Sequence, residues 1–223
     1  MKIFIDFDDV LFNTGKFRED YKKIFWKNNI SKEIFEKYYY DYPLKQKNGH
    51  LKKYDAWEHI KKIKNSEKID VNNLKKEIIS FLDKSEKYVF SDVADFMDSF
   101  GKSNLYLVSY AVTDFQKLKI KNSKIKKYFE KIIITDSMKS VPIKKIIKEG
   151  VEEAFFLDDR VEQIGDVKRE IPEIKTIFVH RKEGRYKDRK NKYCDFECSN
   201  LKQAQKIIKS WKKQNGKSKY REK

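Results

Sequence analysis

The chain has 223 residues, a formal net charge of +17, 16 Phe and 13 Tyr, so it can bury a core and disorder throughout is excluded. No apolar run approaches the roughly 20 residues that span a bilayer, and Asp6 interrupts the N-terminal one. Cys194 and Cys198 are too few for a disulfide framework, and no second Cys or His pair stands beside them to complete a zinc site. We therefore expect a cytoplasmic protein with no signal peptide and no membrane partner.

The first predicted strand, residues 2–6, ends in clustered carboxylates. Asp6, Asp8 and Asp9 follow an apolar run, whereas a buried strand normally stops at turn residues. Two carboxylates about 4 Å apart repel by roughly 4 kcal/mol at an effective dielectric constant of about 20, so the cluster needs a positive partner. A hard cation bound through oxygen atoms is the natural candidate. The sequence thus predicts a metal site at the carboxyl end of a central strand.

Residues 13–91 contain no convincing strand. Their apolar residues keep helical spacing in four groups, around Phe17 to Phe25, Ile34 to Tyr39, Trp57 to Ile63 and Leu74 to Leu82. Ser31 and Asp70 are expected N-caps of two of these helices. We predict an all-helical unit inserted after the first strand, with its aromatic faces in its own core. The alternative for a few of them, such as Tyr38 to Tyr40, is that they line a substrate cleft.

Four more strands are predicted at residues 105–108, 132–134, 154–157 and 176–179. Helices are predicted between them at 113–121, 141–149 and 160–170, and Asp92 is expected to cap a further helix that ends at Phe100. Short apolar strands that alternate with helices indicate an α/β fold, a parallel sheet with helices on both faces.

The C-terminal region is strongly basic. A charged loop at 180–190 is followed by a predicted edge strand at 193–197, a closing helix at 201–213 and a frayed basic tail at 214–223. Residues 181–223 carry 16 basic and 5 acidic side chains, which is 11 of the 17 net charges. A solvated tail is the simplest interpretation, and weak contact with a nucleic acid is the main alternative.

Two segments at strand ends carry a family resemblance. The first is Asp6-Phe7-Asp8-Asp9-Val10-Leu11, and the second is the Phe-Leu-Asp-Asp run at 156–159. They resemble the first and fourth motifs of the haloacid dehalogenase-like (HAD) hydrolase superfamily, which are D-x-D-x-[TV]-[LV] and an acidic pair after an apolar strand. Asp9 stands where many members of the family carry Gly. The resemblance spans residues 2–180.

The second and third motifs of the family have weaker counterparts. Ser109 ends an apolar strand as the second motif requires, and Lys139 resembles the lysine of the third, with Lys144 as an alternative. The resemblance implies a Rossmann-like three-layer core made of residues 1–12 and 92–213. It also implies that residues 13–91 form a helical cap, which in this family closes over the site and selects the substrate.

The resemblance implies a role for each site residue. Asp6 would be the nucleophile that forms an aspartyl-phosphate, and Asp8 would act as general acid and then as general base. Ser109 and Lys139 would bind the phosphoryl oxygens. The Mg²⁺ ligands would be Asp6, the backbone carbonyl of Asp8, and one residue of the pair Asp158 and Asp159.

We therefore expect a magnesium-dependent phosphomonoester hydrolase. The substrate would be a small phosphorylated metabolite such as a nucleoside monophosphate, because the Leu-Asp-Asp-Arg run at 157–160 resembles that of the family's deoxyribonucleotidases. A dehalogenase is disfavoured because it lacks the second aspartate of the first motif. A nucleic-acid end-processing phosphatase, a phosphomutase and a non-enzymatic phosphate or nucleic-acid binding protein remain alternatives.

Overall fold

The computed structural model describes residues 1–40, 54–66, 68–147 and 153–218. In these ranges six strands form one sheet in the order β3-β2-β1-β4-β5-β6, and all neighbours are parallel. The strands are β1 (Lys2–Ile5), β2 (Leu105–Tyr110), β3 (Lys131–Thr135), β4 (Ala154–Asp158), β5 (Lys175–Val179) and β6 (Phe196–Cys198). The predicted α/β fold is confirmed, and this strand order is that of a doubly wound Rossmann sheet.

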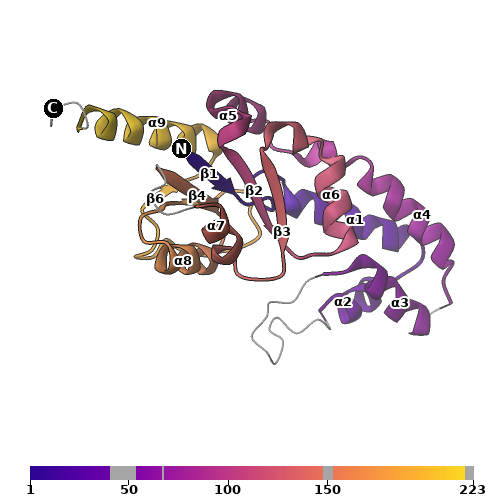
Figure 1. Ribbon diagram of the computed structural model, residues 1–223. Helices are drawn as coiled ribbons and strands as arrows, with labels where there is room; N and C mark the ends of the chain where they lie inside the picture. The colour runs from indigo at the N-terminus through magenta and orange to yellow at the C-terminus, as the bar shows by residue number, and fades with distance from the viewer. Residues whose placement is uncertain (41–53, 67, 148–152, 219–223) are drawn as a thin grey trace.

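Both faces of the sheet are buried, which explains why its strands are continuous apolar runs. Side chains alternate between two cores: Ile3 and Ile5 join one, and Phe4 joins the other. The first core includes residues of α5 (Val93–Phe100), α6 (Asp114–Asn122) and α9 (Leu201–Ser218). The second includes residues of α7 (Ser140–Ile146) and α8 (Val161–Glu170). The result is the expected three-layer arrangement (Figure 1).

In the described residues, four α-helices lie between β1 and α5, as predicted. They are α1 (Thr14–Lys27), α2 (Lys32–Tyr40), α3 (Ala56–Ser66) and α4 (Val71–Leu82), followed by the short 3₁₀ helix η1 (Ser85–Tyr88). Asp70 caps α4 by accepting from Asn73 N at 3.0 Å, and Ser31 accepts from Ile34 N at 3.2 Å. α1 packs beside α4 and α2 beside α3 (Figure 1).

The chain enters and leaves this helical insert through one short two-stranded neck, residues 11–13 and 88–90. Phe12 and Val89 form an antiparallel bridge. On either side of it, Asn13 N donates to Tyr88 O at 2.8 Å and Phe90 N to Leu11 O at 3.0 Å. The insert is therefore joined to the sheet directly beside the carboxyl end of β1.

Three predicted boundaries were wrong in detail. The edge strand begins at Phe196 rather than at residue 193, because Thr176 binds Tyr193 O and the Asp195 carboxylate before the ladder starts. α7 ends at Ile146, where Ile147 becomes extended, and the rest of the helix predicted to 149 lies outside the described residues. α9 continues to Ser218, so its backbone remains helical over 214–218, where fraying was expected.

Asp92 has a different role from the predicted one. Its side chain makes no capping hydrogen bond to α5. It accepts instead from Leu201 N at the start of α9 and from the Arg181 guanidinium, each at 2.8 Å. Asp92 thus ties the N-terminus of α9 to the connection after β5. None of the helices in the described residues is both long enough and apolar enough to cross a membrane.

Candidate active site

The turn after β1 brings three aspartates to the carboxyl edge of the sheet, on the side where β1 points toward α1 (Figure 1). Leu11 N and Phe12 N both donate to Phe7 O, at 3.0 and 3.1 Å, which folds residues 7–12 into a compact turn. Asp9 adopts the left-handed conformation there, with φ of 56°. Asp tolerates this region better than most residues, and Gly does so best, which accounts for an acidic residue at a position that favours Gly.

Asp6, Asp158 and Asp159 converge on one point. They come from the ends of β1 and β4, are at most 8% exposed, and offer carboxylate oxygens that all lie within 4.8 Å of one another. Lys139 Nζ lies 2.6 Å from Asp6 Oδ1 and 2.6 Å from Asp158 Oδ2. Burial raises the pKa of Asp6 against the opposing charge of Lys139, and burial also raises the pKa of Asp159, with the nearby Asp158 adding to it.

Lys139 is fixed at the start of α7 by side chains from α8. Lys139 N donates to Gln163 Oε1, and Ser140 N donates to Asp166 Oδ2, each at 3.3 Å. These acceptors satisfy two N–H groups at the beginning of the helix. The alternative lysine, Lys144, lies on the surface and pairs with Glu170. Of the two candidates, Lys139 is the one beside the carboxylates.

The Asp8 carboxylate points to a different set of partners. Its Oδ1 accepts from Thr14 Oγ1 and from Lys119 Nζ, each at 2.6 Å, and its Oδ2 accepts from Gln116 Nε2 at 2.8 Å. The same Gln116 Nε2 lies 2.9 Å from Ser109 Oγ. Because the amide can donate both of its hydrogens, Gln116 orients both Asp8, the acid/base candidate, and Ser109, the phosphate-binding candidate.

Lys119 is a buried cation surrounded by aromatic rings. Its Nζ lies 5.4 Å from the ring centroids of Phe7 and Phe12 and 5.6 Å from that of Phe17. Burial lowers the pKa of Lys119, and its pairing with Asp8 opposes that effect. Burial also acts to raise the pKa of Asp8, but Lys119 and then Arg185 outweigh it and hold that pKa well below its usual range. Asp8 is therefore a carboxylate in this state of the site.

Arg185, from the connection between β5 and β6, completes the charge pattern. Its Nε donates to Asp9 Oδ2 at 2.6 Å, while Asp9 Oδ1 is buried without a hydrogen-bond partner. Gly15 makes this approach possible, because a Cβ there would lie 3.0 Å from Glu183 O. The connection after β5 thus packs directly on the turn that carries Asp8 and Asp9.

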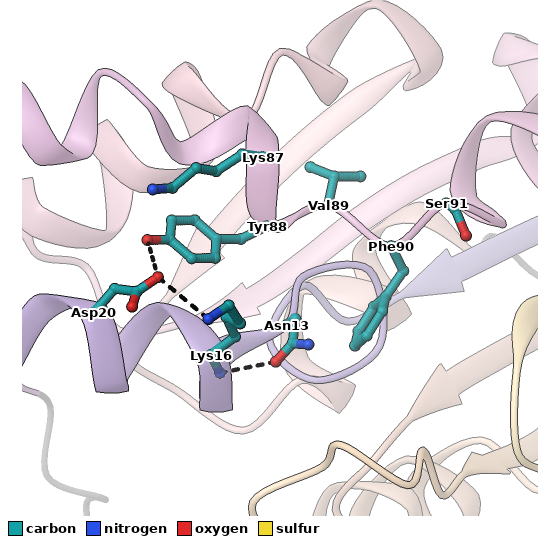
Figure 2. A pocket seen from close by; sticks show the side chains of 8 residues that line it. All are labelled: Asn13, Lys16, Asp20, Lys87, Tyr88, Val89, Phe90 and Ser91. Atoms are coloured by element: carbon teal, nitrogen blue, oxygen red, sulfur yellow. Dashed lines mark hydrogen bonds and ion pairs between the residues drawn. The ribbon is translucent and has the colours of Figure 1, made fainter.

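A cavity of about 270 Å³ lies beside the neck and the start of α1. Figure 2 shows Tyr88 and Lys16 both directed at Asp20, whose Oδ2 is 3.0 Å from the Tyr88 hydroxyl and 3.7 Å from Lys16 Nζ. The Asn13 side chain accepts from Lys16 N and caps α1. None of the residues that line this cavity belongs to the carboxylate cluster, so the cavity and the cluster are separate features.

The buried carboxylates fit a divalent cation. Three carboxylates face one lysine, which leaves two negative charges uncompensated within the cluster. All the donors are oxygen atoms, the ligand type that Mg²⁺ prefers. Both oxygens of Asp158 already accept hydrogen bonds, from Lys139 Nζ and from Arg160 N. Asp6 and Asp159 are therefore the better direct ligands.

The structure divides the predicted residues into two groups: Asp6, Asp158, Asp159 and Lys139 form one, and Asp8 and Ser109 are joined by Gln116 in the other. The sequence analysis missed Gln116, Lys119 and Arg185. Gln116 and Lys119 had a signal, because they share the buried face of α6 with Phe115 and Ile120, where polar residues are unexpected. Arg185 lies in a charged loop and had no local signal.

Comparisons with known proteins identify the fold. No protein-family model matches the sequence, and no curated protein matches it significantly. Among solved structures, a haloacid dehalogenase-like hydrolase from Burkholderia xenovorans LB400 is similar, with a TM-score of 0.71 and 12% identity over 94% of this chain and 96% of that one. The magnesium-bound HAD-hydrolase YfnB from Bacillus subtilis has a TM-score of 0.61 and 14% identity, over 93% of this chain and 98% of its own. L-2-haloacid dehalogenase from Xanthobacter autotrophicus has a TM-score of 0.61 and 12% identity, over 94% and 98%. The HAD resemblance is thus confirmed for the fold.

Proposed function

We propose that this chain, which has the fold of HAD-like hydrolases, is a magnesium-dependent phosphomonoester hydrolase that works through an aspartyl-phosphate. The supporting observation is that Asp6 and Asp8, two residues apart in the chain, have different surroundings. Asp6 lies with Asp158, Asp159 and Lys139 in a buried cluster, whereas Asp8 is held apart by side chains of α6. Nucleophilic displacement followed by hydrolysis needs this separation, because one carboxylate attacks while the other handles the proton.

In the proposed first step, a carboxylate oxygen of Asp6 attacks phosphorus. The bond from phosphorus to the leaving oxygen breaks, and Asp8, which first takes up a proton from solvent, passes that proton to the leaving oxygen. In the second step Asp8 removes a proton from water, the water oxygen bonds to phosphorus, and the Asp6 carboxylate is released. Lys139 and the Ser109 hydroxyl would contact the phosphoryl oxygens throughout.

Asp6 and Asp159, with the backbone carbonyl of Asp8, would hold Mg²⁺, and Asp158 would orient Lys139 beside them. When bound, the cation would offset the charge of the carboxylates and of the phosphoryl oxygens. A dehalogenase reaction is less well supported, although one of the similar structures is L-2-haloacid dehalogenase. The second aspartate, Asp8, is present and is hydrogen-bonded by three side chains. In a phosphatase it would have the function of transferring a proton to the leaving oxygen.

The helical insert, residues 13–91, is proposed as a cap that selects a small phosphorylated metabolite. Its attachment through the neck, directly after the turn that carries Asp8, supports this role. A nucleoside monophosphate remains the first substrate to test. A phosphomutase would use the same groups, with a second substrate hydroxyl in place of water.

Contact with a nucleic acid is a second candidate for the C-terminal region. Exposed lysines recur along α9, at Lys202, Lys206, Lys209, Lys212 and Lys213, and the helix extends beyond the sheet (Figure 1). If a polynucleotide end is the substrate, turnover should fall steeply with salt. If the substrate is a small metabolite, the loss should be modest.

The test is phosphate release from a panel of phosphomonoesters, with and without Mg²⁺, by the wild type and by Asp6→Asn. We expect magnesium-dependent turnover that the substitution abolishes. Turnover retained by Asp6→Asn would remove Asp6 as the nucleophile. Turnover unaffected by a chelator would refute the metal assignment.

A further inference from the structure

Arginines gather at the carboxyl edge of the sheet in a chain that otherwise uses lysine. Only 7 of the 52 basic residues are Arg, yet Arg160, Arg181 and Arg185 all lie at the end of β4 or in the connection after β5. Arg181 is buried and serves the fold, because its Nε donates to Val10 O at 2.9 Å. Arg160 and Arg185 border the carboxylate cluster and are partly exposed, with 34% and 24% of their side chains accessible.

Arg160 follows Asp159 directly and contacts the connection after β5. Its Nε lies 3.3 Å from Asp188 Oδ2, and its guanidinium lies 3.9 Å from the ring centroid of Tyr186. Asp188 also accepts from Val161 N, which fixes the loop to the start of α8. The terminal amino groups of Arg160 make one loose contact, at 3.9 Å to Glu162.

Arg185 approaches the same tyrosine. Its guanidinium lies 5.0 Å from the Tyr186 ring centroid, and its Nε is taken by Asp9. In both arginines the closest carboxylate contact is at Nε, so the terminal amino groups are the donors left for a ligand. Arg185 is bound to Asp9, which is next in the chain to Asp8, the proposed proton donor to the leaving oxygen.

We propose that Arg160, Tyr186 and Arg185 form a subsite for a second anionic group, a phosphate or a carboxylate, carried on the leaving-group side of a small phosphomonoester. The inference rests on the proposed function and narrows its substrate class. A planar guanidinium binds such groups through two parallel hydrogen bonds, which a lysine cannot do. Stacking on Tyr186 orients the Arg160 guanidinium before the ligand binds, which reduces the conformational entropy lost on binding.

The test compares propane-1,3-diol bisphosphate with propyl phosphate, which lacks the second anion. The background is Asp6→Asn, so binding is measured by calorimetry, with Mg²⁺ present, independently of turnover. We expect the bisphosphate to bind at least about tenfold more tightly after correction for its two equivalent ends, as hydrogen bonds to charged groups allow. Adding Arg160→Gln should remove most of this preference and leave the affinity for propyl phosphate unchanged, while Arg160→Lys should restore only part of it.

The matched control is Arg169→Gln near the other end of α8, since the Arg169 guanidinium also contacts a tyrosine ring, 5.1 Å from the centroid of Tyr193. It should leave the preference intact. Equal binding of both esters, or equal losses for both in Arg160→Gln, would overturn the subsite. Tighter binding of a 5′-phosphorylated dinucleotide than of the bisphosphate would overturn the assignment to a small phosphomonoester, because it would identify a polynucleotide as the source of the second anion. Lack of turnover by the wild type would refute the proposed function, but the preference for the bisphosphate over propyl phosphate could still be measured by calorimetry.

Discussion

Lys119 and Asp8 form an ion pair, with Nζ 2.6 Å from Oδ1, although the two residues belong to α6 and to the turn after β1. The lysine side chain is 5% exposed and the aspartate side chain 21%. A cation buried among aromatic rings is costly unless a partner compensates it. This pair therefore ties the helix after β2 to the proposed acid/base residue, and several expectations depend on it.

Lys119→Met should destabilise the protein by about 3 kcal/mol, because removing one partner of a buried pair leaves the other charge uncompensated. Urea unfolding would measure the loss. When Asp8→Asn is already present, Lys119→Met leaves no such charge. Lys119→Met should therefore reduce the free energy of unfolding much less in that background than in the wild type. Strictly additive losses would show that the two side chains do not interact energetically.

Gln116→Met should impair leaving-group departure selectively. The substitution preserves the size of the side chain but removes both N–H donors, so Asp8 loses a contact that orients it. We expect kcat/KM to fall about tenfold to a hundredfold for an alkyl phosphate, whose leaving oxygen needs a proton. For p-nitrophenyl phosphate the fall should be smaller. Equal losses on the two esters would indicate a role in phosphate binding or in folding alone.

His59 should make the helical insert sensitive to acid. Its Nε2–H donates to Phe35 O at 3.1 Å, and its Nδ1 accepts from Tyr54, whose hydroxyl lies 2.7 Å from that of Tyr21. Burial, in the main, lowers the pKa of His59 from 6.5 to about 4. As pH falls through this window the unfolded chain binds the proton first, so stability falls with pH, by about 3 kcal/mol in all.

Unfolding by urea at several pH values across this window measures the effect. His59→Gln should flatten that part of the profile, since Gln does not titrate. An unchanged pH dependence in the variant would assign the acid sensitivity to other groups.

Asp92→Asn should loosen the C-terminal helix. The amide would present an N–H₂ group to Arg181 or to Leu201 N, both of which are donors, so we expect a loss of about 3 kcal/mol. Hydrogen exchange along α9 would report it. Asp95→Asn on the exposed face of α5 is the matched control and should have little effect; similar losses in both would contradict this role for Asp92.

The sequence located the elements better than the contacts between them. Apolar periodicity predicted the strands and the inserted helices, because burial on two faces imposes continuous runs and burial on one imposes helical spacing. It could not reveal that Asp92 caps α9 rather than α5, since that contact depends on packing between distant segments. For the same reason, the strand ends predicted the carboxylate cluster, whereas the partnership of Gln116 with Asp8 emerged only in three dimensions.

The most direct test of the central claim is to identify the phosphorylated residue. Asp8→Asn should slow hydrolysis of the intermediate, so the variant should accumulate an acyl-phosphate with an activated ester such as p-nitrophenyl phosphate. Borohydride reduction and mass spectrometry of the peptides would then locate the modified residue. We predict modification at Asp6 and its absence in Asp6→Asn/Asp8→Asn. Modification at another residue, or wild-type turnover with no acyl-phosphate in Asp8→Asn and with inversion of configuration at phosphorus, would contradict the mechanism.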